Sequence, residues 1–251
     1  MLNKINPECL ELLPEAVLFD TDNTLYDYYP ANHKAVSAVA DKINNLIGVT
    51  SKDFYSAYSL ARNQIKTELG TIASSHSRLL YFQRVLEILG FKAQLMIALD
   101  LEQTFWRTFL SNAPLFPGVL ELLQLLRLHN IPIAIITDLT SHIQLRKLTY
   151  FNLEDTFDAV VTSEEAGADK PDRRNFELTL KKLNLSNKNH TWMIGDNPKT
   201  DILGGKTIDA ITFQKLHRGA SPGFGPEQPD YTFDDFLDVI QLFKKFITNP
   251  I

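Results

Sequence analysis

Cysteine is almost absent from this 251-residue chain, which has only Cys9. A single cysteine excludes an internal disulfide framework and suits a reducing compartment, and its place near the N-terminus argues against a nucleophile. An excess of basic residues is also lacking, because 25 lysines and arginines face 30 aspartates and glutamates, for a formal charge of -5. The chain therefore has no electrostatic footprint for a nucleic acid or an anionic membrane, and an anionic substrate would need local help such as a metal.

Long hydrophobic runs are lacking as well. No apolar run approaches the length of a membrane span, and residues 1–8 lack the apolar stretch of a secretion signal. We therefore expect a cytoplasmic location and neither a nucleic-acid nor a membrane partner. What is present is an ordinary globular composition with 44% hydrophobic residues, enough for one large domain or a domain with a substantial insertion.

Short apolar runs alternate with segments of helical length and spacing from about residue 115 onward. The runs predict buried strands at residues 133–136, 157–161, 191–194 and 210–213, with one more at 15–20 and a short last one at 230–233. The segments between them predict helices at 118–129, 141–151, 172–183 and 199–206, and a final helix starts near 234. Repeated βα units of this kind predict an α/β fold with a mostly parallel sheet, which binds ligands outside the carboxyl ends of its strands.

Residues 28–111 break this pattern and contain no clear buried strand. Their apolar spacing predicts about four helices, near residues 31–47, 51–69, 76–90 and 95–110. Prolines punctuate the chain at both ends of the segment, at Pro30, Pro114 and Pro117. We therefore predict a core formed by residues 1–27 and 112–251, interrupted by a helical insertion at 28–111. We expect the aromatic residues Phe105, Trp106 and Phe109 to form the core of that insertion.

An acidic pair, Asp20 and Asp22, follows the first buried strand in the sequence Asp-Thr-Asp-Asn-Thr. Like charges two residues apart at the end of a strand repel each other, so a cation between them would explain the arrangement. One carboxylate could attack phosphorus directly, while the second protonates the leaving oxygen and later activates water. A polar turn after a strand is the alternative, because turns favour Asp and Asn.

Three further sites follow strands downstream. Thr137, with Asp138 after it, ends an apolar run and could donate to a phosphoryl oxygen, although a threonine often simply ends a strand. Lys170 precedes Pro171, which could occupy the first turn of a helix, and the lysine could neutralise a nucleophile and a phosphoryl group or be a surface residue. Asp196 and Asp201 frame the next helix start. Asp20 and Asp196 are the carboxylates that Mg²⁺ would need, and Asp201 could instead be an ordinary acid of a helix start.

These residues, in this order, resemble the four motifs of the haloacid dehalogenase-like superfamily. The resemblance rests on Asp20-x-Asp22-x-Thr24, Thr137, Lys170-Pro171 and Gly195-Asp196-x-x-x-x-Asp201, and it spans essentially the whole chain. It implies a Rossmann-like core with an inserted all-α helical cap domain. The insertion between the first and second motifs is similar to the cap of the superfamily's phosphatase, phosphoglucomutase and dehalogenase branch.

The resemblance also implies a role for each matched residue. Asp20 would be the nucleophile and a Mg²⁺ ligand, and Asp22 would be the general acid and base and give its backbone carbonyl to the metal. Thr137 would hold the phosphoryl group, and Lys170 would stabilise its charge. Asp196 would bind Mg²⁺, and Asp201 would support the metal's water shell or orient Lys170.

Candidate substrate-binding residues lie both in the core and in the insertion. Asn23 and Asp138 adjoin the first and second motifs, and related sequences often have asparagine in place of Asp138. A carboxylate that pointed inward there would repel a substrate phosphate. The polar segment 71–78 brings His76 and Arg78 together and is the expected specificity loop, with a plain surface loop as the alternative.

Asp22 separates the activities within this superfamily. Haloacid dehalogenases resemble this chain without the second acid, and a phosphonate hydrolase has a non-acidic residue at that position. We therefore expect a Mg²⁺-dependent phosphatase that acts on a small phosphorylated metabolite, such as a sugar phosphate, a nonulosonate 9-phosphate or a nucleotide, through an aspartyl phosphate. A sugar phosphomutase keeps both aspartates and is one alternative. A non-catalytic domain that binds an anion is another.

Overall fold

The chain divides into two compact units in the computed structural model, which describes residues 1–9, 12–186 and 190–248. One unit comprises Met1–Asp27 and Leu115–Ile251, and the other comprises Tyr28–Pro114. The sequence placed the second boundary at residues 111 and 112, and the compact units divide three residues later. Within the described part of the chain, no helix is both long enough and apolar enough to span a membrane.

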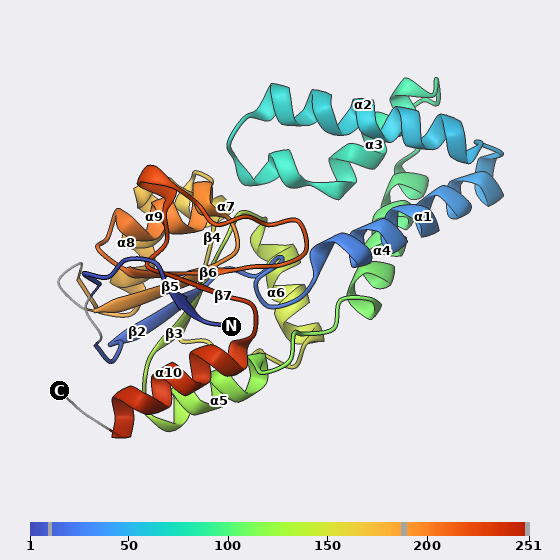
Figure 1. Ribbon diagram of the computed structural model, residues 1–251. Coiled ribbons are helices and arrows are strands. Elements are labelled where there is room, and N and C mark those ends of the chain that lie inside the picture. The colour runs from blue at the N-terminus through green and yellow to red at the C-terminus, as the bar shows by residue number, and fades with distance from the viewer. Residues whose placement is uncertain (10–11, 187–189, 249–251) are drawn as a thin grey trace. The chain divides into compact units, whose positions relative to one another are not determined.

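The first unit is built on a sheet of seven strands within the described residues, in the order β1-β7-β6-β5-β2-β3-β4 (Figure 1). The strands are β1 (Asn3–Lys4), β2 (Ala16–Phe19), β3 (Ile133–Thr137), β4 (Ala159–Thr162), β5 (Thr191–Gly195), β6 (Ile211–Lys215) and β7 (Tyr231–Phe233). Only the edge strand β1 pairs antiparallel, with β7, among the described pairs. The predicted α/β fold with a mostly parallel sheet is confirmed. The pattern missed β1, because its two residues are polar and exposed.

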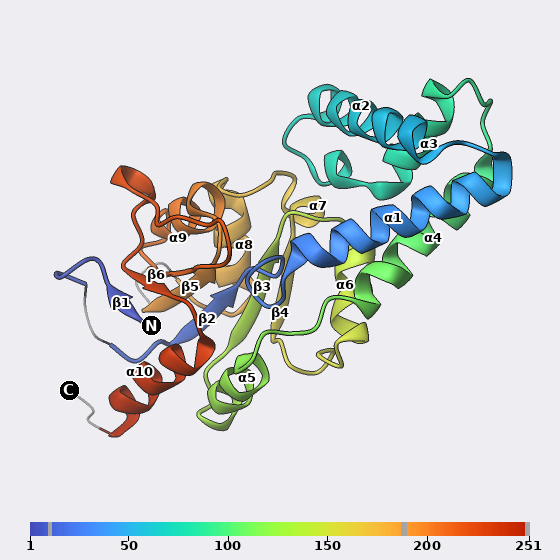
Figure 2. The same cartoon turned by 45° about the vertical axis from the view of Figure 1, so that its right-hand side comes forward.

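Helices cover both faces of this sheet. They are α5 (Val119–Leu128), α6 (Ser141–Tyr150), α7 (Ser163–Ala166), α8 (Arg173–Lys182), α9 (Leu203–Lys206) and α10 (Phe236–Thr248), with a π-helical turn η2 (Pro198–Ile202) and a 3₁₀ turn η3 (Gly225–Glu227). Helices α5 and α10 lie on one face, and α8 and α9 lie on the other (Figures 1 and 2). A parallel sheet covered on both sides explains why its strands are continuous apolar runs.

Strand β5 shows how the two faces are filled. Successive side chains of a strand point to opposite faces, so Trp192 and Met193 enter different halves of the core. The Trp192 ring lies 4.7 Å from that of Phe213 and 6.1 Å from that of Phe243 in α10, measured between centroids. Met193 belongs to the opposite cluster, which contains Phe176 of α8. Side chains therefore pack against β5 on both faces of the sheet.

The second unit is helical, as predicted. Its elements are α1 (Tyr28–Ile47), α2 (Ser51–Leu69), the 3₁₀ turn η1 (Ala73–His76), α3 (Arg78–Ile88) and α4 (Leu95–Ser111). Aromatic side chains fill the space between these helices, and Phe82, Phe105 and Phe109 are fully buried. Trp106 is 2% exposed, which agrees with a place in the core of this unit.

Gly204 allows α9 to approach α8, and replacing it should destabilise the core unit. A Cβ atom at this position would lie 2.2 Å from both Cε2 and Cζ of Phe176, well inside van der Waals contact. We expect Gly204→Ala to lower the free energy of unfolding by about 1–3 kcal/mol, measured by urea denaturation, because overpacking forces neighbouring atoms to shift. The double variant Gly204→Ala, Phe176→Leu should lose less unfolding free energy than the sum of the losses of the two single variants. Strictly additive losses would contradict a clash between the new Cβ atom and Phe176.

Candidate active site

Three neighbouring strands bring the acidic residues of the sequence motifs to one edge of the sheet. Strands β5, β2 and β3 lie side by side, and Phe19 pairs in register with Ile194 on one side and Ile135 on the other. Asp20 and Asp196 follow β2 and β5 directly, and Thr137 is the last residue of β3. The carboxyl ends of parallel strands thus gather these side chains where α/β sheets bind ligands.

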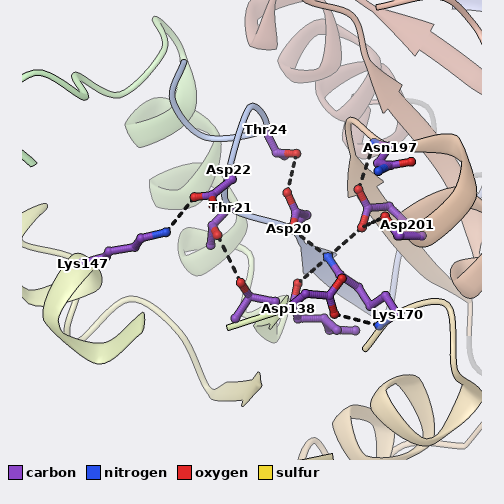
Figure 3. Close-up of polar contacts among 12 residues, drawn as sticks. Asp20, Thr21, Asp22, Thr24, Asp138, Lys147, Lys170, Asn197 and Asp201 are labelled. Atoms are coloured by element: carbon purple, nitrogen blue, oxygen red, sulfur yellow. Dashed lines mark hydrogen bonds and ion pairs between the residues drawn. The ribbon is translucent and has the colours of Figure 1, made fainter. Parts of the chain in front are cut away.

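Lys170 joins two of the carboxylates. Its ammonium donates to Oδ1 of Asp20 at 2.6 Å, to Oδ1 of Asp201 at 2.7 Å and to the carbonyl oxygen of Ile136 at 3.1 Å (Figure 3). The side chains of Lys170 and Asp201 are 2% and 0% exposed, and that of Asp20 is 10% exposed. One buried cation therefore connects the ends of β2 and β3 with the turn after β5.

Burial and neighbouring charges shift the pKa values of these groups in opposite directions. Desolvation raises the pKa of Asp20 to about 6, although the neighbouring Lys170 ammonium opposes the rise. Desolvation also raises the pKa of Asp201, again against the attraction of Lys170. Burial lowers the pKa of Lys170, but Asp20, Asp201 and Asp138 outweigh it and leave that pKa well above its ordinary value. Lys170 thus stays charged and favours the ionised form of both aspartates.

Gly195 allows Asp201 to reach this network. A Cβ atom on Gly195 would lie 2.4 Å from Cβ of Asp201, so a larger residue at the end of β5 would displace the aspartate. Oδ2 of Asp201 accepts the backbone N–H of Asn197 at 3.0 Å. The sequence predicted Asp201 in the first turn of a regular helix, and the structure places it instead in the π-helical turn Pro198–Ile202.

The loop before α8 holds Lys170 in place. Helix α8 begins at Arg173 with Asp172 as its N-cap, so the expectation that Pro171 occupies the first helical turn is wrong. Instead, the side-chain amide of Asn175 donates to the carbonyl oxygens of Ala168, at 2.9 Å, and Asp172, at 3.3 Å. These bonds fix the backbone on both sides of Lys170.

Asp20, Asp196 and Asp201 could together hold a metal ion. Each offers a carboxylate oxygen, and these oxygens lie within 4.8 Å of one another. Desolvation raises the pKa of Asp196, whereas a hydrogen bond of 3.1 Å between its Oδ2 and Nε2 of His217 lowers it in part. Three carboxylates around a single ammonium leave an excess of negative charge on hard oxygen donors, which is the donor chemistry of a divalent cation such as Mg²⁺. The residues fit such an ion.

The carboxylate of Asp22 lies apart from this cluster. Its Oδ1 accepts the Lys147 ammonium of α6 at 2.7 Å and also the hydroxyl of Tyr26. Figure 3 shows Asp22 turned toward Lys147, whereas Asp20 points to Thr24 and Lys170. Lys147 was not among the site residues predicted from the sequence. It lies with Leu148 on the buried face of α6, and no local pattern marks it as a site residue.

Threonines and a strained turn complete the loop after β2. Thr24 donates its hydroxyl to Oδ2 of Asp20 at 3.0 Å, and the hydroxyl oxygens of Thr21 and Thr137 lie 3.4 Å apart. Asn23 has a φ of 61°, in the left-handed region that asparagine tolerates better than most residues. The geometry therefore gives Asn23 a role in the turn, while its predicted contact with substrate stays a prediction.

Asp138 points to the backbone of the lysine loop. Its Oδ1 accepts the N–H of Lys170 at 2.7 Å, so this carboxylate ties the end of β3 to the loop between α7 and α8. Desolvation raises the pKa of Asp138 to about 6, although Lys170 opposes the rise. The structure gives Asp138 a positioning contact, and a direct contact with substrate stays a prediction.

The two candidates in the helical unit, His76 and Arg78, lie at the end of η1 and the start of α3. The Arg78 guanidinium donates to the carbonyl oxygen of His76 at 2.7 Å and to the hydroxyl of Tyr28 at 2.5 Å. It also lies 5.1 Å from the ring centroid of Phe105. Arg78 therefore helps to hold its own unit together, and the role of both residues in substrate binding stays a prediction.

The fold and the site define a class of α/β protein with an acidic centre at the carboxyl edge of a mostly parallel sheet. The family model for haloacid dehalogenase-like hydrolases matches residues 14–209. The chain belongs to this family, which confirms the resemblance found in the sequence.

The similarity to known proteins covers most of the chain. Ribulose-1,5-bisphosphate 5-phosphatase of Halopiger xanaduensis is 38% identical over 198 residues, 78% of this chain and 82% of that protein. Glyceraldehyde 3-phosphate phosphatase of Methanocaldococcus jannaschii is 26% identical, over 92% of this chain and 97% of that protein. Among solved structures, a 2-haloacid dehalogenase from Pseudomonas syringae has the same fold, with a TM-score of 0.73 and 21% identity over 93% of this chain and 99% of the other.

Replacing Asp138 by asparagine should stabilise the protein at alkaline pH. The pKa of Asp138 is about 6 in the fold against an ordinary 3.8, so between these values the folded protein binds more protons and stability falls as pH rises. Asparagine keeps an acceptor for Lys170 and removes the charge. A shift of about 2 pKa units sets an upper limit of about 3 kcal/mol on the gain at pH 8.

Urea denaturation of Asp138→Asn and of the wild type at pH 4 and pH 8 measures this effect. The stability difference should grow in favour of the variant at pH 8. Asp155→Asn, at an exposed aspartate of the same unit, is the matched control and should differ equally from wild type at both pH values. A difference for Asp138→Asn that does not change with pH would contradict the assignment.

Proposed function

We propose that this protein is a Mg²⁺-dependent phosphatase that hydrolyses a small phosphorylated metabolite through an aspartyl phosphate on Asp20. The observation that carries the proposal is the buried Lys170 ammonium 2.6 Å from Oδ1 of Asp20, with a second carboxylate, Asp22, two residues away. A carboxylate beside a fixed cation can attack a phosphoryl group whose charge the same cation neutralises. The single cysteine and the charge of -5 support a cytoplasmic enzyme without a nucleic-acid partner.

The names of the relatives support phosphoryl chemistry. Besides the two phosphatases described above, they include a phosphoserine phosphatase of Thermus thermophilus, 28% identical over 57% of this chain, and the pyrimidine 5'-nucleotidase YjjG of Escherichia coli, 35% identical over 44%. All four names describe proteins that act on phosphate esters of small molecules. We extend to this chain the class of substrate that these names share.

The first half-reaction uses the two aspartates of the β2 loop. An oxygen of Asp20 forms a bond to phosphorus while the bond from phosphorus to the leaving oxygen breaks. Asp22 gives its proton to that leaving oxygen. Lys170 balances the negative charge on the phosphoryl oxygens, and the Thr137 hydroxyl donates to one of them.

The second half-reaction releases phosphate. Asp22, now ionised, takes a proton from a water molecule whose oxygen attacks phosphorus. The bond between phosphorus and Asp20 breaks, and inorganic phosphate leaves. Thr24 and Lys170 each hold an oxygen of Asp20, at 3.0 and 2.6 Å, so the nucleophile returns to the same orientation for the next cycle.

A metal completes the proposed site. Asp20, Asp196 and the backbone carbonyl of Asp22 would hold Mg²⁺, and Asp201 would support its water shell or orient Lys170. The ion, when bound, would neutralise and orient the phosphoryl group. The solved structure of YfnB from Bacillus subtilis, which is bound to magnesium, has the same fold, with a TM-score of 0.68 and 23% identity over 92% of this chain.

Loss of the nucleophile or of the metal should abolish turnover. We expect the wild type to release phosphate from p-nitrophenyl phosphate with Mg²⁺, to stop with EDTA and to recover when Mg²⁺ is restored. Asp20→Asn should lower kcat by at least ~10³-fold, because an amide cannot form the acyl phosphate. Asp155→Asn should keep the wild-type rate. A robust rate from Asp20→Asn would remove Asp20 as the nucleophile.

A panel of phosphorylated metabolites should identify the substrate class. It includes sugar phosphates and bisphosphates, triose phosphates, phosphoserine, a nonulosonate 9-phosphate and nucleoside monophosphates, and it is read as released phosphate and kcat/KM. We expect phosphate release, with one group preferred at least ~10-fold, because buried polar contacts discriminate strongly between leaving groups. Isomerisation that depends on a bisphosphate, without phosphate release, would favour a sugar phosphomutase. No turnover by a folded wild type would favour a domain that only binds an anion.

A further inference from the structure

Asp22 has its own set of hydrogen-bond donors, separate from that of Asp20. Its Oδ1 accepts the Lys147 ammonium at 2.7 Å (Figure 3) and also the hydroxyl of Tyr26. Asp20, by contrast, is held by Thr24 and Lys170. Two carboxylates two residues apart are therefore fixed by different elements, with α6 supplying the cation for Asp22.

The position of Lys147 is tightly constrained. Its side chain is 2% exposed, whereas that of Asp22 is 38% exposed. A buried ammonium is costly unless a carboxylate pairs with it, so the contact with Asp22 offsets the burial of Lys147. The ammonium also lies 5.7 Å from the ring centroid of Tyr26, and this ring is 1% exposed and packs 5.0 Å from that of Phe151. Packing thus holds the Lys147 ammonium and the Tyr26 hydroxyl in one orientation.

The bonds to Oδ1 fix the orientation of the Asp22 carboxylate. A charge-assisted hydrogen bond from an ammonium, with a second bond from a phenol, holds this oxygen in a defined direction. A general acid and base must present its carboxyl group in a fixed direction to the leaving oxygen and then to water.

We propose that Lys147, together with Tyr26, is a positioning residue that holds Oδ1 of Asp22 and so orients its carboxyl group for proton transfer. This inference rests on the proposed function, in which Asp22 is the acid and the base. The proton of Asp22 passes to the leaving oxygen as the bond to phosphorus breaks. The ionised Asp22 then accepts a proton from the attacking water. In this inference Lys147 acts on the reaction through Asp22.

A purely structural ion pair between α6 and the β2 loop makes a different prediction. A structural role would lower the activity for all substrates alike, and it would do so whether or not Asp22 can exchange a proton. A positioning role depends on the leaving group, since an acid matters most when the leaving oxygen is basic. Phenyl phosphate has a more basic leaving group than p-nitrophenyl phosphate at nearly the same shape, so the two substrates separate these roles.

The experiment compares Lys147→Met, Asp22→Asn and the double variant on both aryl phosphates with Mg²⁺. We expect Lys147→Met to lower kcat/KM for phenyl phosphate by about 10–100-fold. This loss is smaller than the full rate enhancement from general acid–base catalysis, which is about 10²–10⁴-fold. The loss for p-nitrophenyl phosphate should be several-fold smaller. In the Asp22→Asn background, Lys147→Met should cause no further loss on either substrate, because the group through which it acts is gone.

Two further variants keep the test decisive. Tyr26→Phe removes one donor to Oδ1 and keeps the ring, so it should show the same dependence on leaving group and background with a smaller loss. If thermal unfolding shows that Lys147→Met does not fold, Tyr26→Phe tests the inference in its place. Lys215→Met is the matched control, because Lys215 is another buried lysine of the core unit, 4% exposed, that donates to the carbonyl of Leu216. Any effect of this control should be the same in both backgrounds.

The outcomes separate this inference from the proposed function. Equal losses on both substrates, or a further loss in the Asp22→Asn background, would show a structural role and overturn the inference alone. A slow Asp22→Asn enzyme beside an unchanged Lys147→Met enzyme would also overturn it alone. A wild-type rate for Asp22→Asn would remove the acid and base role of Asp22, and the inference would fail with it.

Discussion

The site depends on the ion pairs that the Lys170 ammonium forms. It lies between two buried carboxylates, Asp20 and Asp201, and each bond is shorter than 2.8 Å. Removing one partner of a buried ion pair leaves an uncompensated charge, so these three groups are stable only together. This requirement explains the surrounding structure. Asn175 and Asp138 both fix the backbone near Lys170, and the packing of β5 sets where the turn carrying Asp201 begins.

The two aspartates of the β2 loop have similar chemistry but different environments. Asp20 lies in the buried network, and burial raises its pKa to about 6. The side chain of Asp22 is more than one-third exposed and turns to α6. Different environments allow two carboxylates to take different roles, as nucleophile and as acid and base, on adjacent stretches of one loop. The two side chains differ because Asp20 directly follows the buried strand β2 and faces Lys170, whereas Asp22 faces Lys147 of α6.

Most of the fold and the matched motif residues could be predicted from the sequence, because both are recorded in local patterns. Apolar runs located the parallel strands, and strand ends located Asp20 and Asp196. The rest depends on tertiary contacts without a local signature. Edge strand β1 is two polar residues that pair only because β7 is there. Lys147 is an ordinary helical lysine until α6 packs beside the β2 loop. The turn of Asp138 toward the Lys170 backbone likewise joins two segments that only the fold brings together.

The fold does not determine the chemistry of this family. A 2-haloacid dehalogenase has the same fold with a TM-score of 0.73, while the protein named ribulose-1,5-bisphosphate 5-phosphatase is 38% identical to this chain over 198 residues. Single side chains must therefore separate the reactions. Attack on carbon needs no proton for a leaving oxygen, whereas phosphate ester cleavage does, and in the proposed function Asp22 supplies it. A buried lysine and a buried tyrosine held on one oxygen of Asp22 are an arrangement that a dehalogenase would not need, which favours phosphate ester chemistry for this chain.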